Sequence, residues 1–212
     1  MTNRAHAVLL VAVPVAFSGL LWQHPVLRDP EDLLAATTRF QIVHLGMVVT
    51  FCLLAVGMHV LLAGLRGGAA AVGRIALIPF VAFYVPYLAF EGVAAGVLGQ
   101  ELNELPAAQR DAIAPGLIED FSRNPIVGEP GIFWALGSAA WLVAVVAAVL
   151  AFRRAGAPLA LQALLGTSAL VAAHTPPLGA IGLLAFAGAG WMVLRRRHAA
   201  ATEAAPAVAT VA

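Results

Sequence analysis

The side chains in this sequence that could do chemistry gather around one acid, Glu91. It lies in an apolar stretch of membrane length, and Tyr84 and Tyr87 precede it at helical spacing, so the three side chains share one face. A carboxylate at that depth costs about 2.5–3.5 kcal/mol on insertion scales unless it is protonated, paired or in contact with water. Glu91 therefore predicts an outward-facing polar pocket that binds a small ligand or a proton, with Tyr84, Tyr87 and His44 as its other residues.

Three histidines are expected on the same side of the membrane as this acid. At a rise of about 1.5 Å per residue, His44 and Glu91 fall in the outer halves of their helices, and His24 and His174 stand at outer helix ends. Imidazole and carboxylate groups are the usual ligands of divalent metals. We predict His44, Glu91 and His174 as metal ligands, with His24 as a substitute or as a hydrogen-bond partner of a ligand. No local motif such as HExxH fixes any pair.

Haem is the other cofactor that these histidines could hold. His44 and His59 lie fifteen residues apart on one helix, enough to serve one haem near each leaflet, with His174 as the outer partner and His6 as the inner one. Histidines near helix ends are more often hydrogen-bonded core or interfacial residues than ligands. The sequence therefore leaves the cofactor open between a haem, a divalent metal and none.

The composition favours an integral membrane protein over a soluble domain. Of the 212 residues, 61% are hydrophobic and 11% are charged, which is too apolar for an ordinary soluble domain of this size. All twelve basic residues are arginines, which excludes a retinal Schiff base, a P-loop lysine and a lysine nucleophile. The lone cysteine, Cys52, excludes an internal disulfide and a thiolate metal cluster.

The apolar stretches predict an all-α bundle of six transmembrane helices that forms a single membrane domain over residues 1–197. The expected helices cover about 5–22, 40–65, 74–99, 132–152, 158–173 and 178–194. In the third helix, Pro79 and Pro86 predict kinks because each removes a backbone donor. Gly92 and Gly96 predict the close approach of a neighbouring helix.

Two segments are expected outside the bundle. The outer loop, residues 100–131, is too long for a simple connector. It carries apolar residues near helical spacing, namely Leu105, Ile113, Leu117 and Phe121. We predict a short amphipathic helix on the membrane surface, interrupted near Pro115. The tail, residues 198–212, is rich in Ala, Thr and Pro and is predicted to be disordered.

The arginines predict the orientation in the membrane. One side of the six-helix arrangement collects eight arginines with Glu203 as its only acid: Arg4, Arg66, Arg74, Arg153, Arg154, Arg195, Arg196 and Arg197. By the positive-inside rule this side is cytoplasmic, so both termini are expected inside a cell membrane that the chain crosses several times.

Four functions fit these features. The leading one is the binding or transport of a small ligand or cation at Glu91, coupled to protons. The alternatives are a haem- or metal-binding redox protein, a membrane enzyme that modifies a lipid or isoprenoid, and a structural protein without an active site. The sequence does not decide whether the chain is an enzyme. The expected partners are the lipid bilayer and a small ligand, with a homodimer as one arrangement for so small a carrier and no nucleic acid.

Overall fold

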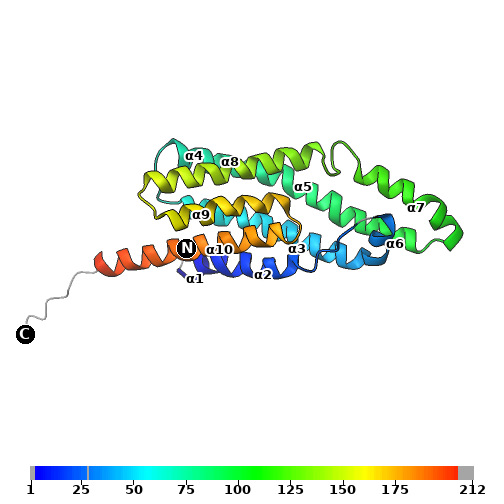
Figure 1. Ribbon diagram of the computed structural model, residues 1–212, viewed down its shortest axis with the longest axis horizontal. Helices are drawn as coiled ribbons and strands as arrows, with labels where there is room; N and C mark the ends of the chain where they lie inside the picture. The colour runs from blue at the N-terminus through cyan, green and yellow to red at the C-terminus, as the bar shows by residue number, and fades with distance from the viewer. Residues whose placement is uncertain (1–2, 28, 205–212) are drawn as a thin grey trace, which may run out of the picture.

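The computed structural model describes residues 3–27 and 29–204, and within that part of the chain every regular element is helical. Five helices are long and apolar enough to cross a membrane: Arg4–Leu21, Pro30–Leu62, Gly68–Asn103, Ile132–Arg154 and Leu178–Thr202. A sixth, Leu159–Ala173, lies beside them but is shorter. All six run roughly parallel or antiparallel in one elongated bundle (Figure 1). The prediction of an all-helical membrane-type bundle is confirmed at this level.

The long helices are composites of shorter elements. The first consists of α1 (Asn3–Ala7), a π-helical segment (Val8–Ala12) and α2 (Val13–Leu21). The third comprises α4 (Gly68–Pro79), α5 (Val85–Leu88) and α6 (Ala95–Asn103), joined by π-helical segments at Phe80–Tyr84 and Ala89–Ala94. The remaining elements are α3 (Pro30–Leu62), α7 (Ala107–Ser122), α8 (Ile132–Arg154), α9 (Leu159–Thr167) with a 3₁₀ turn (Ser168–Ala173), and α10 (Leu178–Ala204).

Three helices are clearly longer than predicted. The third membrane helix runs over Gly68–Asn103 rather than about 74–99. Helix α3 begins about ten residues earlier than hydropathy suggested, because Asp29 caps it by accepting a hydrogen bond from the Asp32 amide (3.0 Å) and Pro30 starts its first turn. Helix α10 continues to Ala204 rather than ending near residue 194. The structure thus places residues 198–204, which the sequence assigns to a disordered tail, in a helix, and residues 205–212, like Arg28, lie outside the described part of the chain.

Pro79 and Pro86 were predicted to kink the third helix. In the structure each is followed by a segment in which the backbone hydrogen bonds change from the α-helical to the π-helical pattern. A π-helical segment follows Pro79 directly and another begins three residues after Pro86. Such segments are frequent at functional sites because the extra residue per turn re-aims the side chains around it. Glu91 lies inside the second segment.

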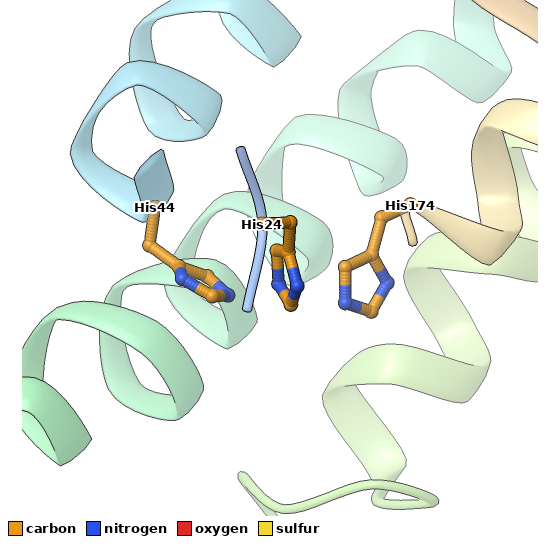
Figure 2. A group of neighbouring side chains, drawn as sticks. All are labelled: His24, His44 and His174. Carbon is orange, nitrogen blue, oxygen red and sulfur yellow. The ribbon is translucent and has the colours of Figure 1, made fainter. Parts of the chain in front are cut away.

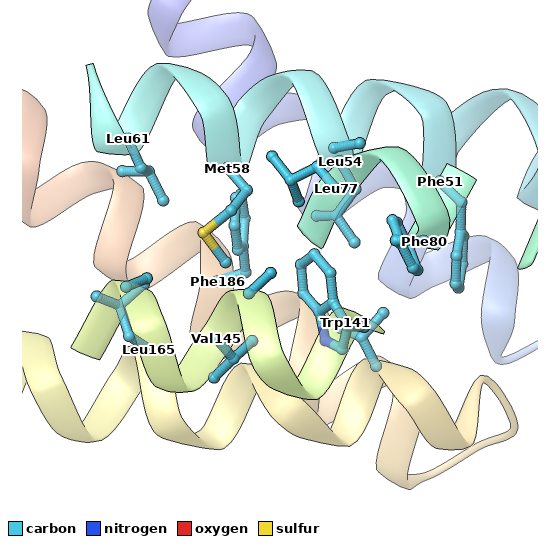
Figure 3. Close-up of a cluster of buried hydrophobic side chains, with 14 of the residues drawn as sticks. Phe51, Leu54, Met58, Leu61, Leu77, Phe80, Trp141, Val145, Leu165 and Phe186 are labelled. Carbon is cyan, nitrogen blue, oxygen red and sulfur yellow. The ribbon is translucent and has the colours of Figure 1, made fainter. Parts of the chain in front are cut away.

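The core is made by large apolar side chains from most of the long helices. Phe51 and Met58 of α3, Phe80, Trp141 of α8 and Phe186 of α10 are all buried there (Figure 3). Trp141 donates its indole N–H to the Ser168 carbonyl (3.0 Å). Apolar residues also cover the outside of the helices, such as Ile42, Ile75, Ile78, Val146 and Leu184. Apolar surface on both sides of a helix is what a bilayer environment requires.

The outer loop contains a helix, α7, which runs through Pro115 without the predicted interruption. Two residues of the predicted apolar face, Ile113 and Leu117, are exposed. The buried residues of α7, Ala114 and Ile118, pack with Leu33 and Phe40 of α3 and Leu102 of α6 in a second, smaller apolar cluster. Figure 1 shows α6 and α7 at the end of the molecule that is farther from the chain's N-terminus. The position of α7 on a membrane surface stays a prediction.

Candidate metal centre

Three histidines from separate parts of the chain meet beside the middle of α3. His24 comes from the connection after α2, His44 from the middle of α3 and His174 from the turn between α9 and α10. Each ring offers one nitrogen, and these nitrogens lie within 4.8 Å of one another. Figure 2 shows the His24 ring between the other two, which are directed toward it. His44 and His174 are almost completely buried, with 0% and 1% of their surface exposed.

The hydrogen bonds at the Nδ1 atoms fix how these rings are protonated. His24 Nδ1 lies 2.8 Å from the Pro25 carbonyl and His44 Nδ1 lies 2.9 Å from the Phe40 carbonyl. A carbonyl only accepts, so each Nδ1 carries the proton. In a neutral ring Nε2 is then a lone-pair acceptor, and both Nε2 atoms are buried.

His174 is held in the same way through a tyrosine. The Tyr84 hydroxyl donates to the Ala172 carbonyl (2.8 Å), and its oxygen lies 3.3 Å from His174 Nδ1. Since the hydroxyl proton is already used, His174 Nδ1 is the donor in the second contact. This leaves the Nε2 lone pair of all three rings for a metal ion, and outer partners at Nδ1 are what orient histidine ligands in metal sites.

Glu91 lies directly beside the cluster, as predicted. Its Oε2 is 3.0 Å from His44 Nε2, and its side chain is 20% exposed. With Nδ1 protonated, a His44 ring that also carries a proton on Nε2 forms an ion pair with Glu91, whereas in a neutral ring the two lone pairs face each other and repel. A cation between or beside them removes this repulsion.

Gly92 allows the approach of α3 to the π-helical segment that carries Glu91. A Cβ at this position would collide with three atoms of the His44 side chain. Gly96 stands one turn further along against Gln41 and Thr37 of the same helix. The predicted close approach at Gly92 and Gly96 is therefore confirmed, and it is the contact that sets the distance between His44 and Glu91.

Tyr87 does not contact the histidine nitrogens by a hydrogen bond but links the site to the outer loop. Its hydroxyl donates to Glu129 Oε2 (3.0 Å), while its ring lies 5.7 Å from that of His174 between centroids. Burial raises the pKa of the Glu129 carboxyl, and the hydrogen bond from Tyr87 acts against that rise. Glu129 was not among the predicted site residues, because an acid in a polar loop has no periodicity to mark it.

Burial keeps His24 and His174, the two histidines that lie in connections between helices, neutral. Burial lowers the pKa of His174 from 6.5 to about 3, an effect that Glu91 opposes and the neighbouring imidazoles reinforce. Burial likewise lowers the pKa of His24 to about 4, with His44 acting in the same direction. Neutral imidazole is the form that binds a metal, so these two rings need no proton loss at neutral pH.

The haem alternative finds no support in this arrangement. The rings of His44 and His174 are 6.5 Å apart between centroids, but the His24 ring lies between them. A porphyrin needs that space for its own plane. The predicted inner pair is also absent from the core, because His59 is exposed on α3 and His6 is only half-buried.

The structure thus brings His24, His44, His174 and Glu91 together, with Tyr84 and Tyr87 behind them. His24 belongs to the central group, although the sequence suggested it only as a substitute. Comparisons with protein-family models, with curated proteins and with solved structures found no match, so the function of the chain has to be inferred from this site.

Proposed function

We propose that the chain is an integral membrane protein with six transmembrane segments that binds one divalent transition-metal ion, zinc in the first place, through His24, His44 and His174. The observation that carries this proposal is that each of the three imidazole rings offers one nitrogen within 4.8 Å of the others, while the Nδ1 atom of every ring has a hydrogen-bond partner. Three Nε2 lone pairs facing one space repel each other, and a metal ion converts that repulsion into binding.

Glu91 is proposed as the fourth ligand. A divalent ion held by three neutral imidazoles keeps its full charge, which is unfavourable at membrane depth. One carboxylate halves that net charge, and the ion in turn offsets the cost of burying the carboxylate. Zinc is favoured over magnesium or calcium, because nitrogen ligands in a four-coordinate shell suit zinc and the other two ions prefer oxygen.

Elemental analysis of the detergent-purified protein tests this proposal. We expect close to one zinc ion per chain after incubation with zinc and removal of the excess, and strong loss of zinc in His44→Ala and His174→Ala. The His59→Ala variant is the matched control, because His59 lies on the same helix as His44 and faces outward. A metal-free wild-type protein, or equal zinc in all variants, would refute the proposal.

Carriage of the bound cation across the membrane is a second candidate, and the non-α segments favour it. Interrupted helices that flank a polar site are common in secondary transporters, and here one π-helical segment carries Glu91 and another ends at Tyr84. Proteoliposomes with an internal zinc indicator test this candidate. It predicts zinc entry that is lost in Glu91→Gln, whereas a site that only stores the ion gives binding without entry.

A further inference from the structure

The arginine-rich end of the bundle holds a cavity that is separate from the histidine site. It measures about 310 Å³ and lies between the ends of α3 and α8, the beginning of α9 and the second half of α10. Its walls are apolar, with Leu61, Phe152, Leu161 and Val193, and its charged residues are Arg196 and Arg197. A cavity of this size is large enough for a small ligand or a lipid headgroup.

Arg197 is fixed in place by backbone carbonyls. Its Nη2 donates to the carbonyls of Val60 (3.1 Å), Leu61 (3.4 Å) and Ala63 (3.1 Å) at the C-terminal end of α3. Arg74 caps the same helix end by donating to the Leu62 carbonyl (3.1 Å). The two guanidinium groups counter the negative end of the helix dipole, so an anion at this place does not face unpaired carbonyls.

Arg196 has no partner within the described residues. The contacts between ionisable side chains in the described residues, His44–Glu91, Arg110–Asp111 and Arg123–Glu119, do not involve Arg196. Because no carboxylate contacts the Arg196 guanidinium, its positive charge favours the binding of an anion in the adjacent cavity. The planar arrangement of the guanidinium N–H groups matches the spacing of phosphate oxygens.

We propose that this cavity binds the phosphate of an anionic phospholipid, with Arg196 as the main contact, Arg197 as the second and the apolar walls against the glycerol and upper acyl carbons. Basic pockets between transmembrane helices are a known class of headgroup site, and the positive-inside rule places this end at the anionic cytoplasmic leaflet. The proposal does not depend on the metal centre.

Native mass spectrometry of the purified protein with phosphatidylglycerol or phosphatidylcholine tests it. We expect wild-type protein to retain phosphatidylglycerol in preference to phosphatidylcholine, and Arg196→Gln to bind phosphatidylglycerol about fivefold more weakly, the effect of one arginine near a membrane surface. Arg153→Gln is the matched control, because Arg153 is an exposed arginine of the same end that does not line the cavity. Ala63→Leu narrows the cavity without a change of charge and is expected to weaken binding as well.

Equal retention of the two lipids would overturn the proposal, as would an equal loss in Arg153→Gln and Arg196→Gln, which indicates a general charge effect. Displacement of the lipid by an equal concentration of inorganic phosphate would show a site for a soluble anion and overturn the lipid assignment. Retention of lipid by Ala63→Leu at the wild-type level would place the binding outside this cavity.

Discussion

Replacement of Gly92 by alanine is expected to remove His44 from the metal centre. The added methyl group would meet Cβ, Cγ and Cδ2 of His44 at distances far inside an ordinary carbon contact, which needs about 3.5–4.0 Å. The ring must therefore move by roughly 1 Å or more, whereas metal–ligand distances tolerate about 0.2 Å. Loss of a ligand exceeds the 10–100-fold effect of losing an outer partner, so we expect zinc affinity to fall at least about 100-fold.

The same substitution at two other glycines separates this effect from general damage to packing. Gly96→Ala also crowds α3, where it meets Gln41 and the Thr37 carbonyl, but it does not touch His44. We expect it to destabilise the protein by about 1–3 kcal/mol through overpacking and to leave zinc binding intact. Gly19→Ala, on α2, meets nothing within 4 Å and serves as the neutral control.

The assay is a zinc titration with a competing chelator, followed by thermal unfolding of each variant. The reasoning predicts that zinc affinity is lost in Gly92→Ala alone, while unfolding shifts in both Gly92→Ala and Gly96→Ala. Wild-type zinc affinity in a folded Gly92→Ala protein would refute the role of His44 as a ligand at this position. Equal loss of zinc in both crowded variants would show that helix packing, and not the His44 contact, controls binding.

Three further outcomes are expected. Tyr84→Phe removes the hydroxyl that accepts a hydrogen bond from His174 Nδ1, and a competition titration should show zinc binding about 10–100-fold weaker. An unchanged zinc affinity would mean that the turn between α9 and α10 orients the His174 ring without the tyrosine. His59→Ala should leave the absorption spectrum and metal content of the purified protein unchanged, and a Soret band that this variant loses would restore the haem alternative. In the metal-free protein the unfolding temperature should fall as the pH drops from about 6.5 toward 4. The folded state lowers the pKa values of His24 and His174 to about 4 and 3, so over this range the unfolded chain binds protons that the folded protein does not. An unfolding temperature that stays constant over this pH range would contradict the burial of both histidines as neutral rings.

The sequence predicted Glu91, His44 and His174 as ligands, and Glu91 and His44 are the easier two to predict because they lie in apolar helices where a polar residue stands out. Glu91 and His44 were placed at similar depth by counting residues, and the structure brings their side chains to 3.0 Å. The distance itself depends on Gly92, which was read as a packing residue only. Helical spacing shows that a glycine permits close approach but does not show which side chain fills the space.

Residues in connections were harder to place. His24 lies in the segment between α2 and α3, and Glu129 in the loop before α8, where no periodicity fixes a direction. The early start of α3 did have a local signal, since Asp29 followed by Pro30 is a typical helix beginning. Hydropathy overlooked it, because the first ten residues of the helix mix charged and hydroxyl side chains with the apolar ones, of which Leu33 and Leu34 lie in the cluster with α7.

X-ray absorption spectroscopy at the zinc edge of the loaded protein tests the metal centre most directly, because it reports the ligands around the ion itself. The account predicts a four-coordinate shell of three imidazole nitrogens and one carboxylate oxygen at about 2.0–2.2 Å, with the multiple-scattering pattern of histidine rings. The loss of one imidazole in His24→Ala is part of the same prediction. A shell of oxygens without imidazole scattering, or zinc in the sample with an unchanged spectrum in His24→Ala, would contradict the three-histidine site.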